Sequence, residues 1–427
     1  MRPLKKASFP RYCVIWATSP RALGVNSILT QSPENAKTMR KPQRSTPAST
    51  GGAMSSLACH ERQNNHSGAH ALRLGCCCFV RVCISADAPD DGKHSESVAR
   101  YARRPSYKEY VMSMMLAVVF TCVGAATGGA DYIITFEQRA GRMGILVDGE
   151  PFAVYVYEDT KTLRPYFCDV KAPNGAQATR NHPPDPEMDK DNMDHDTFHP
   201  GIWLAFGDLG REDFWRNKAR VRHLRFEEAP QDGAMATFTV VNAYETSGVQ
   251  PRILCEETCA YTITADGTRR LITSKSRFQP LEPGVCFGDQ EEMGCGVRIA
   301  TTLTVRHGSG VILNNHGDVN EKGTWGKQAN WCAYSGVVNG CRVGVMLMAG
   351  PGNFRQSWFH NRDYGLMVAN PFGKKSMTAP TDRAVSPDAT PLKKDMALEL
   401  SYAVCVFSTL SEEHPEYQLI YEAYVNH

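Results

Sequence analysis

Short runs of apolar residues, many alternating with polar ones, recur from about residue 130 to the end of the chain. Runs rich in Val, Ile, Thr and aromatic residues occupy 132–137, 221–228, 236–244, 297–305 and 398–407. Runs of this length and composition predict β-strands, and no helical period separates them. Strands at short spacing without intervening helices indicate an antiparallel all-β fold, either a sandwich or a barrel.

Three dipeptides between apolar runs predict β-hairpins. Asp148-Gly149, Asp266-Gly267 and Asn339-Gly340 each separate two strand-like segments. Asp-Gly and Asn-Gly fit two-residue turns, because both central residues of such a turn need positive φ. The hairpins support the all-β prediction.

The C-terminal segment 411–427 is the one part of the body with a helical pattern, and it places Leu419, Ile420 and Tyr424 on one side. The body has no repeat of fixed period. We therefore expect residues 131–427 to form one large antiparallel β-sandwich domain with a short C-terminal helix.

The first 110 residues differ from the body in pattern and charge. They hold 17 Lys and Arg against 7 Asp and Glu, whereas the remainder holds 30 against 38. Their Pro, Ser, Arg and Asn residues follow no helical or strand period, so too little apolar area is available to offset the ordering entropy. We expect a disordered or spurious N-terminal extension. A basic nucleic-acid-binding tail and an organellar transit peptide are the alternatives.

Residues 111–130 resemble a secretory signal peptide. An apolar middle of about twelve residues ends in small residues, with Gly128 and Ala130 at the −3 and −1 positions of a cleavage after Ala130. The segment predicts a secreted or periplasmic protein; a membrane anchor and a buried element are the alternatives. The mature chain shows no further membrane span. Its eight cysteines could form disulfides after export or remain as buried thiols.

Several motifs of common enzyme classes do not occur. The sequence has no GxGxxG or Walker loop after a strand, no GxSxG and no HExxH. Nucleotide-dependent chemistry and the common hydrolase triads are therefore disfavoured. We expect no cofactor, no metal and no nucleic-acid partner. A metal held by His182, His195 and His199 is an alternative, although FHPGIW does not form the helix that would align a His-x-x-x-His pair.

Polar and aromatic side chains concentrate in segments that we expect to be loops, at 163–184, 194–215, 288–300, 314–331 and 353–373. Indole and phenol rings stack on the apolar faces of sugars, while carboxylates, amides, His and Arg bind the hydroxyl groups. Paired His and carboxylate groups can also move protons at a sugar. The composition of these segments thus favours a carbohydrate or similar small-molecule ligand.

Candidate residues follow from this composition. For acid–base chemistry we expect His195 or His199 as the acid and Glu291 or Glu292 as the base. For substrate binding we expect Arg180, Trp203, Asn315, His316, Trp358, Arg362, Asp363, Tyr364 and Asn370. Three alternatives remain open. Trp203 could belong to the core, and Arg362 could form an ion pair with Asp363. Glu291 and Glu292 would point to opposite faces if they lie on a strand, so that only one serves the pocket.

The motifs RPYFCDVKAPNGAQATR, DHDTFHPGIWLAFGD, GDQEEMGCGVRIA and RDYGLMVANPFG resemble the PmoA-like family. They lie in order between residues 164 and 373. Where relatives typically have DHPHHRGLWF, this chain has Asp196, Thr197 and Pro200 in place of Pro, His and Arg. The resemblance implies a large β protein of unknown function, similar in fold to galactose-mutarotase-type supersandwiches with a sugar site on a concave face. The family label, methane oxygenase, implies membrane spans of about 20 apolar residues, and the body has none.

Together these observations predict an exported β-sandwich that acts on or binds carbohydrate, as an epimerase, a mutarotase or a glycoside-cleaving enzyme. The alternative is a non-catalytic sugar-binding or structural sandwich; a metal-dependent oxidative enzyme is a third possibility. An enzyme should bring a His and a carboxylate to within about 5–9 Å around an open pocket, by analogy with paired catalytic carboxylates. A structural role would leave these groups buried and mutually paired. The sequence leaves the oligomeric state open.

Overall fold

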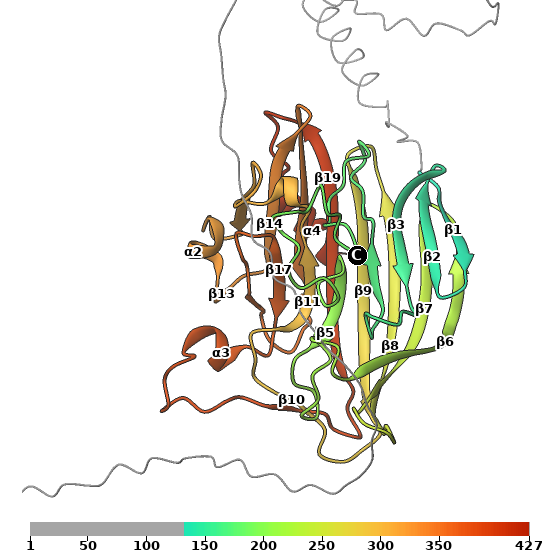
Figure 1. The fold of residues 1–427 in the computed structure, drawn as a ribbon, viewed down its shortest axis with the longest axis vertical. Coiled ribbons are helices and arrows are strands. Elements are labelled where there is room, and N and C mark those ends of the chain that lie inside the picture. Colours follow the sequence, from blue (N-terminus) through green and yellow to red (C-terminus); the bar gives the residue numbers. More distant parts are fainter. Residues whose placement is uncertain (1–131, 427) are drawn as a thin grey trace, which may run out of the picture. The chain divides into compact units, whose positions relative to one another are not determined.

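The computed structural model describes residues 132–426, which form two large antiparallel sheets and one small one. The nine-stranded sheet has the order β1-β2-β3-β4-β5-β11-β17-β16-β13, and the eight-stranded sheet has the order β12-β14-β15-β19-β9-β8-β7-β6. Strands β10 and β18 form the small sheet. In Figure 1 β1 and β6 lie at one side and β13 and β14 toward the other. The predicted segments 1–110 and 111–130 lie outside the described residues.

The strands of the first half are β1 (Ile134–Arg139), β2 (Arg142–Val147), β3 (Glu150–Val156), β4 (Tyr166–Cys168), β5 (Ile202–Phe206), β6 (Arg220–Gln231), β7 (Met235–Glu245), β8 (Ile253–Ala265) and β9 (Arg269–Pro280). Those of the second half are β10 (Cys286–Phe287), β11 (Met293–Arg298), β12 (Val311–Asn314), β13 (Lys327–Gln328), β14 (Trp331–Val338), β15 (Cys341–Ala349), β16 (Trp358–Phe359), β17 (Leu366–Asn370), β18 (Thr390–Pro391) and β19 (Leu398–Leu410). The helices are α2 (Asn320–Thr324), α3 (Lys374–Thr378) and α4 (Tyr417–Val425), with a 3₁₀ turn at Thr301–Leu303.

Aromatic side chains from both sheets meet in the main core. The Phe206 ring of β5 lies 5.5 Å from the Phe278 ring of β9 and 5.9 Å from the Tyr244 ring of β7. Tyr155 of β3 packs against Phe238 of β7 at 5.1 Å. Side chains that interdigitate between two antiparallel sheets define a β-sandwich. The predicted fold class, an antiparallel sandwich with a short C-terminal helix, is confirmed.

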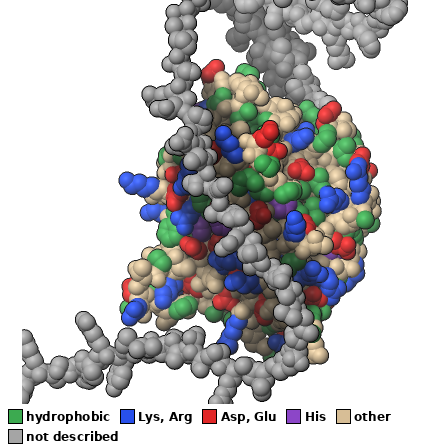
Figure 2. All heavy atoms as spheres, viewed as in Figure 1, with side chains coloured by type: hydrophobic (Ala, Val, Ile, Leu, Met, Phe, Trp, Pro, Cys, Tyr) green, Lys and Arg blue, Asp and Glu red, His purple; other side chains and the backbone are tan. Residues whose placement is uncertain are grey.

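The outer faces of the two sheets are covered differently. Helix α4 packs Tyr417, Ile420 and Tyr421 onto the outer face of the eight-stranded sheet. The outer face of the nine-stranded sheet instead carries a separate buried cluster that includes Trp203 and Trp215. Long loops between β4 and β5 and between β5 and β6 contribute to that cluster. The candidate chemistry lies on this second face. On the face drawn in Figure 2, acidic and basic side chains are interspersed.

The hairpin predictions are confirmed, with one difference in turn geometry. Asp148-Gly149 joins β2 to β3 with φ values of 50° and 80°, and Asn339-Gly340 joins β14 to β15 with 52° and 77°. Asp266 and Gly267 join β8 to β9 without positive φ. There the Asp266 carboxylate accepts hydrogen bonds from the backbone N–H groups of Thr268 and Arg269, both at 2.8 Å. This side-chain bonding replaces the two-residue turn.

Two other details differ from the predictions. The run 297–305 is not one strand, because β11 ends at Arg298 and a 3₁₀ turn follows at Thr301–Leu303. Leu419 does not share the buried side of α4, since its side chain is 60% exposed. The helix instead begins at Tyr417, and its buried side is set by Tyr417, Ile420 and Tyr421.

No helix within 132–426 has the length and apolar character needed to cross a membrane. All eight cysteines of the body, from Cys168 to Cys405, are free thiols. The alternative with unpaired cysteines therefore holds for this part of the chain.

Candidate functional site

The loop at residues 192–199 is tied down by one buried arginine. Arg180 has 1% exposure, and its guanidinium group donates to the backbone carbonyl oxygens of Asn192 at 2.6 Å and Asp194 at 2.7 Å. It also donates to the carbonyl oxygens of His195 at 3.3 Å and His199 at 3.4 Å. A buried guanidinium needs partners for its donors, and here the loop backbone accepts hydrogen bonds from both Nη atoms, while Nε has no partner among residues 132–426. Arg180 therefore fixes the shape of the loop.

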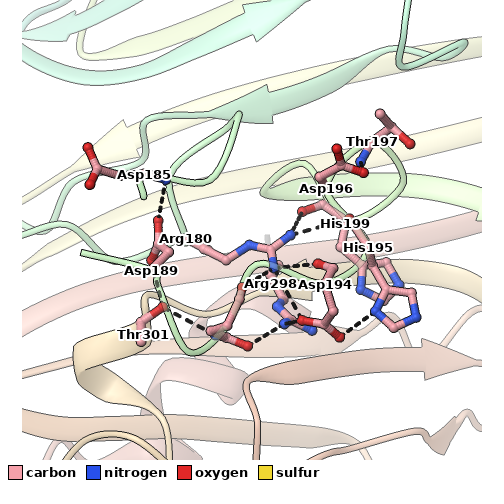
Figure 3. Close-up of polar contacts among 11 residues, drawn as sticks. Arg180, Asp185, Asp189, Asp194, His195, Asp196, Thr197, His199, Arg298 and Thr301 are labelled. Atoms are coloured by element: carbon pink, nitrogen blue, oxygen red, sulfur yellow. Dashed lines mark hydrogen bonds and ion pairs between the residues drawn. The ribbon is translucent and has the colours of Figure 1, made fainter. Parts of the chain in front are cut away.

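This shape brings His195 against its own neighbour, Asp194. The Nδ1 atom of His195 is hydrogen-bonded to the Oδ2 atom of Asp194, and Arg298 of β11 donates to Oδ1 of the same carboxylate at 2.5 Å (Figure 3). The His195 backbone has a φ of 54°. Non-glycine residues adopt this left-handed region rarely, although histidine does so more often than most. Such backbone strain persists where the surrounding structure enforces it.

The carboxylate of Asp194 is held in its charged form. Burial alone would raise its pKa, but the hydrogen bond from His195 and the charges of Arg298 and Arg180 hold the pKa well below its usual range. An ionised Asp194 can only accept a hydrogen bond, so the Nδ1 atom of His195 carries the proton. In neutral His195 the lone pair therefore resides on Nε2. The side chain of His195 is 37% exposed.

His199 occupies the middle of an aromatic stack and is buried. Its ring lies parallel to the rings of His195, at 4.7 Å, and of Trp203, at 5.2 Å. The indole N–H of Trp215 donates to the Nε2 atom of His199 at 3.3 Å. Burial, followed by the charges of Arg298 and other neighbouring cations, lowers the pKa of His199 well below its usual value. His199 is therefore neutral, and its buried ring stacks on the ring of His195.

A cavity of about 350 Å³ opens on the same sheet, near the ends of β11 and β16. It is lined by Glu291, Glu292, Arg306, Glu321, His360, Arg362 and Tyr364. Four of these residues, Glu291, Glu292, Arg362 and Tyr364, were predicted from the sequence. The cavity is polar and carries both signs of charge.

The two adjacent glutamates have different partners. Glu292 forms an ion pair with Arg216, and its side chain is 13% exposed. The Glu291 carboxylate is 44% exposed and lies 3.7 Å from the guanidinium of Arg362. Asn370 holds the backbone here, because its amide donates to the carbonyl oxygens of Gln290 at 2.6 Å and Glu291 at 3.2 Å. Glu291 is thus the better placed of the two to meet a ligand.

His360 sits behind Glu291 as a neutral group. Its Nδ1 atom is 3.2 Å from the carbonyl oxygen of Glu291, and its Nε2 atom accepts a hydrogen bond from Arg362 at 3.0 Å. Burial, with the charge of Arg362, lowers the pKa of His360 to about 3. Arg362 also donates to Glu321 at 2.9 Å. The expected alternative of an Arg362–Asp363 ion pair is wrong, because Arg362 turns to the two glutamates.

Tyr364 connects the cavity to the Asp194–His195 pair. Its ring lines the cavity, and the guanidinium carbon of Arg298 lies 4.4 Å from the ring centroid. Arg298 in turn binds Asp194. A guanidinium over a phenol ring is a favourable cation–π arrangement. The exposed imidazole and the cavity therefore belong to one continuous network.

The remaining predicted binding residues occupy other positions. Trp203 and Trp358 have exposures of only 2% and 7%, so neither presents an open ring to solvent. The Asp363 carboxylate accepts the backbone N–H of Glu321 at 2.9 Å. Asn315 and His316 follow β12 and are not among the residues that line the cavity. Asn315 accepts the backbone N–H of Asn330 at 2.8 Å.

Sequence reasoning did not select five residues that the structure places at the site. Asp194, Arg298, Glu321 and His360 lie in the predicted polar segments but were not chosen as site residues, and Arg306 lies outside those segments. The adjacency of Asp194 and His195 could have been noticed. Nothing in the sequence, however, reports the positive φ that turns the imidazole toward its neighbour.

The three histidines of the metal alternative do not form a common ligand set. His195 and His199 present ring faces to each other, whereas His182 packs edge-on to Tyr166 at 4.9 Å. Within the described part of the chain, no group of three His, Cys, Asp or Glu residues is placed to hold a metal ion. His182, His195 and His199 therefore do not converge as the metal alternative requires.

Residues 142–416 match the model of a family of unknown function, DUF6807. The chain belongs to this family. The match extends from β2 to the residue before α4, so it includes Asp194, His195 and the cavity at Glu291. The comparisons give no support to the PmoA-like name that the motifs suggested.

Among solved structures, this DUF6807 chain is similar to a galactose mutarotase-like protein from Clostridium acetobutylicum, with 10% identity and a TM-score of 0.29. The similarity covers 65% of this chain and 98% of that chain. None of the curated proteins matches.

Proposed function

We propose that this protein binds a carbohydrate at the outer face of the nine-stranded sheet and carries out acid–base chemistry on it. His195 moves the proton, and Glu291 is the carboxylate that assists from the cavity. One observation carries the proposal: His195 is exposed, and its Nδ1 atom is bonded to an Asp194 carboxylate that buried Arg298 holds in place. An imidazole oriented by a carboxylate is a common general acid–base arrangement.

The chemistry of the neighbouring cavity supports a polyhydroxylated ligand. Glu291 and Glu292 can accept hydrogen bonds from hydroxyl groups, and Arg306 and Arg362 can donate to ring and hydroxyl oxygens. The Tyr364 ring supplies an apolar surface for the C–H face of a sugar. A cavity of about 350 Å³ lies within the usual range for small-molecule sites.

The proposed reaction is a proton transfer at an anomeric hydroxyl, a ring oxygen or a carbon next to a carbonyl. The neutral Nε2 atom of His195 would take the proton, and the imidazolium that forms would be stabilised by Asp194. The Glu291 carboxylate would hold or receive the second proton. Epimerisation, mutarotation and bond cleavage all use such a pair.

The experiment compares wild type with His195→Asn on a panel of monosaccharides and glycans. Asparagine tolerates positive φ, so this variant removes the imidazole without forcing the backbone. We expect turnover, followed by NMR of the sugar, to fall about 10²–10⁴-fold, while binding changes little. His414→Asn, at an exposed position after β19, is the matched control and should leave turnover unchanged.

Two results would contradict the proposal. Equal turnover by His195→Asn and wild type would remove His195 from the chemistry. Binding without turnover, unaffected by His195→Asn, would instead favour a non-catalytic sugar-binding sandwich. That second candidate function draws support from the mutual pairing of Arg180, Asn370 and Asp363 with the protein backbone.

We further propose that the protein is exported, on the basis of the signal-like segment 111–130. Fractionation of cells that express the full chain tests this. Recovery of the protein only in the cytoplasm, with residues 111–130 still attached, would overturn it.

A further inference from the structure

A second cavity, of about 670 Å³, lies at the rim of the sandwich. It is bounded by Gly141 and Arg142 at the start of β2, by residues 157–164 after β3, and by the start of β6 at Arg220–His223. It shares no lining residue with the cavity at Glu291. None of the predicted catalytic or substrate-binding residues lines it, although Leu163 and Arg164 belong to the predicted polar segment 163–184.

Two exposed arginines line this rim cavity without forming an ion pair. Arg142 and Arg220 both line it, and neither has a carboxylate partner within 132–426. The adjacent Arg222, by contrast, pairs with Glu245 at 2.6 Å. Arg164 closes the inner wall and has 3% exposure. Its Nη atoms donate to the backbone carbonyl oxygens of Trp215 and Phe198, in the loops after and before β5. Its buried Nε atom has no partner among the described atoms.

The two acidic groups of the rim cavity, Asp159 and Glu158, form no ion pair with these arginines. The Asp159 carboxylate is already used, because it accepts the backbone N–H of Lys161 at 2.7 Å and the hydroxyl of Tyr166 at 2.6 Å. Glu158 is exposed and forms no ion pair with any described residue. Its stem packs over Gly141, where an added Cβ would lie 3.1 Å from the Cβ of Glu158.

An apolar ring completes the lining. Tyr157 is half-buried, its ring lies 4.8 Å from that of His223, and its hydroxyl donates to the carbonyl oxygen of Arg139 at 3.0 Å. The phenol is thereby fixed in orientation. The cavity thus offers two free guanidinium groups, one free carboxylate and one aromatic ring.

We infer that the rim cavity binds an acidic sugar residue of the uronic-acid class. Arg142 and Arg220 bind the ligand carboxylate, since the planar guanidinium matches a carboxylate with two parallel hydrogen bonds. Glu158 accepts hydrogen bonds from ligand hydroxyls, and the C–H face of the ring lies against Tyr157. A bare inorganic anion would use the arginines but would leave Glu158 and Tyr157 without a role.

The rim cavity is joined to the His195 loop through its wall. The Thr162 hydroxyl donates to the carbonyl oxygen of Thr197 at 2.8 Å, and Arg164 donates to that of Phe198 at 2.5 Å. A ligand in the rim cavity therefore rests on the segment that braces residues 197 and 198. This inference goes beyond the proposed function and does not require His195 to be catalytic.

The test is a calorimetric titration of the full chain with glucuronate, with glucose as the neutral match and with inorganic sulfate as the bare anion. We expect glucuronate to bind at least tenfold more tightly than either. The double substitution Arg142→Gln/Arg220→Gln should lower the affinity for glucuronate at least tenfold. Arg225→Gln, on the same strand β6 but outside the cavity, should leave this affinity unchanged. Arg142→Lys/Arg220→Lys should lower the affinity by an intermediate factor, because lysine keeps the charge but lacks the planar guanidinium.

Each contrary outcome is decisive. Unchanged glucuronate affinity in Arg142→Gln/Arg220→Gln overturns the site, and sulfate bound as tightly as glucuronate overturns the assignment to a sugar acid. His195→Asn should keep glucuronate binding even if it loses all turnover. Failure of the rim cavity and failure of the proposed function are thus separate results. Both arginines are exposed, so the double variant is expected to fold, which circular dichroism checks.

Discussion

The Nδ1 atom of His195 is hydrogen-bonded to the Oδ2 atom of Asp194, whose other carboxylate oxygen accepts a hydrogen bond from buried Arg298 at 2.5 Å. The exposed imidazole is therefore anchored, through one carboxylate, to a cation inside the protein. This relationship sets the tautomer of His195 and leaves the lone pair of the neutral imidazole on Nε2. It also makes the pair testable without a known substrate.

Replacing Asp194 by Asn should reverse the His195 tautomer. The amide keeps an oxygen for Arg298 but presents an N–H group to Nδ1, which must then accept a hydrogen bond. We expect the ¹⁵N chemical shifts of neutral His195 to indicate a proton on Nδ1 in wild type and on Nε2 in Asp194→Asn. The same tautomer in both proteins would contradict the proposed orientation.

The same substitution should lower stability in a pH-dependent way. The pKa of Asp194 is depressed in the folded state, so its contribution is present above the unfolded value of about 3.9 and is lost as the pH falls further. At pH 7 we expect Asp194→Asn to be less stable by about 1–2 kcal/mol, a figure reduced because the carboxylate is 44% exposed. Denaturant unfolding should show a smaller difference in the free energy of unfolding between wild type and Asp194→Asn at pH 3 than at pH 7.

Removing one indole N–H should destabilise the histidine stack. Trp215→Phe deletes the donor to the Nε2 atom of His199 and leaves a buried acceptor without a partner. Trp203→Phe is the matched control, because Trp203 lies in the same cluster and its Nε1 atom has no hydrogen-bond partner in residues 132–426. We expect Trp215→Phe to lower the free energy of unfolding by about 1–2 kcal/mol more than Trp203→Phe does. Equal losses would show that the bond contributes nothing.

A methyl group at Gly296 should disturb the surface beneath the site. An added Cβ would lie 2.6 Å from the Trp203 ring, which is closer than real contacts allow. We expect Gly296→Ala to lower the free energy of unfolding by about 1–3 kcal/mol and to shift the His199 resonances. Gly352→Ala, where an added Cβ meets no atom within 4 Å, should have little effect. If the two variants were equally stable, the close packing of Trp203 on β11 would be wrong.

Glu257 should make the sandwich less stable as the pH rises. Its carboxyl is buried between the sheets, and burial raises its pKa even though Ser276, Asn242 and Tyr244 donate hydrogen bonds to it. The folded state then binds more protons than the unfolded state, so stability falls as the pH increases above about 4.3. We expect Glu257→Gln to flatten this decline in thermal melts from pH 4 to pH 8. Glu256→Gln, at the neighbouring position on β8, should retain the wild-type slope.

The strands could be predicted because their signals are local. The turn Asn339-Gly340 and the apolar runs on either side specify β14, β15 and the connection between them within about 20 residues. The end of β11 at Arg298 could not be predicted, since the run VRIATTLTV continues to favour a strand. Isolated backbone bridges hold the chain there instead, with Thr179 pairing to Ile299.

The candidate site was predicted only in part, because most of its contacts join distant segments. Glu291, Arg362 and Tyr364 meet at one cavity, but the pairing of Arg362 with Glu321 depends on α2 lying beside the β16–β17 connection. Trp203 is a typical sugar-stacking residue by composition, yet it is buried beneath His199. Composition identifies groups that can bind a ligand and leaves their exposure undetermined.

The amino-acid pattern alone determined an antiparallel sandwich with a C-terminal helix and the approximate polar segments, because period and turn chemistry act over a few residues. Only the tertiary structure decided that Asp194 and Arg298, 104 positions apart, share one hydrogen bond and that His195 stays exposed while His199 does not. The physical reason is that burial and ionic partners are set by which strands pair and which loops cross them. The burial that follows from these pairings also lowers the pKa of His199 and keeps it neutral.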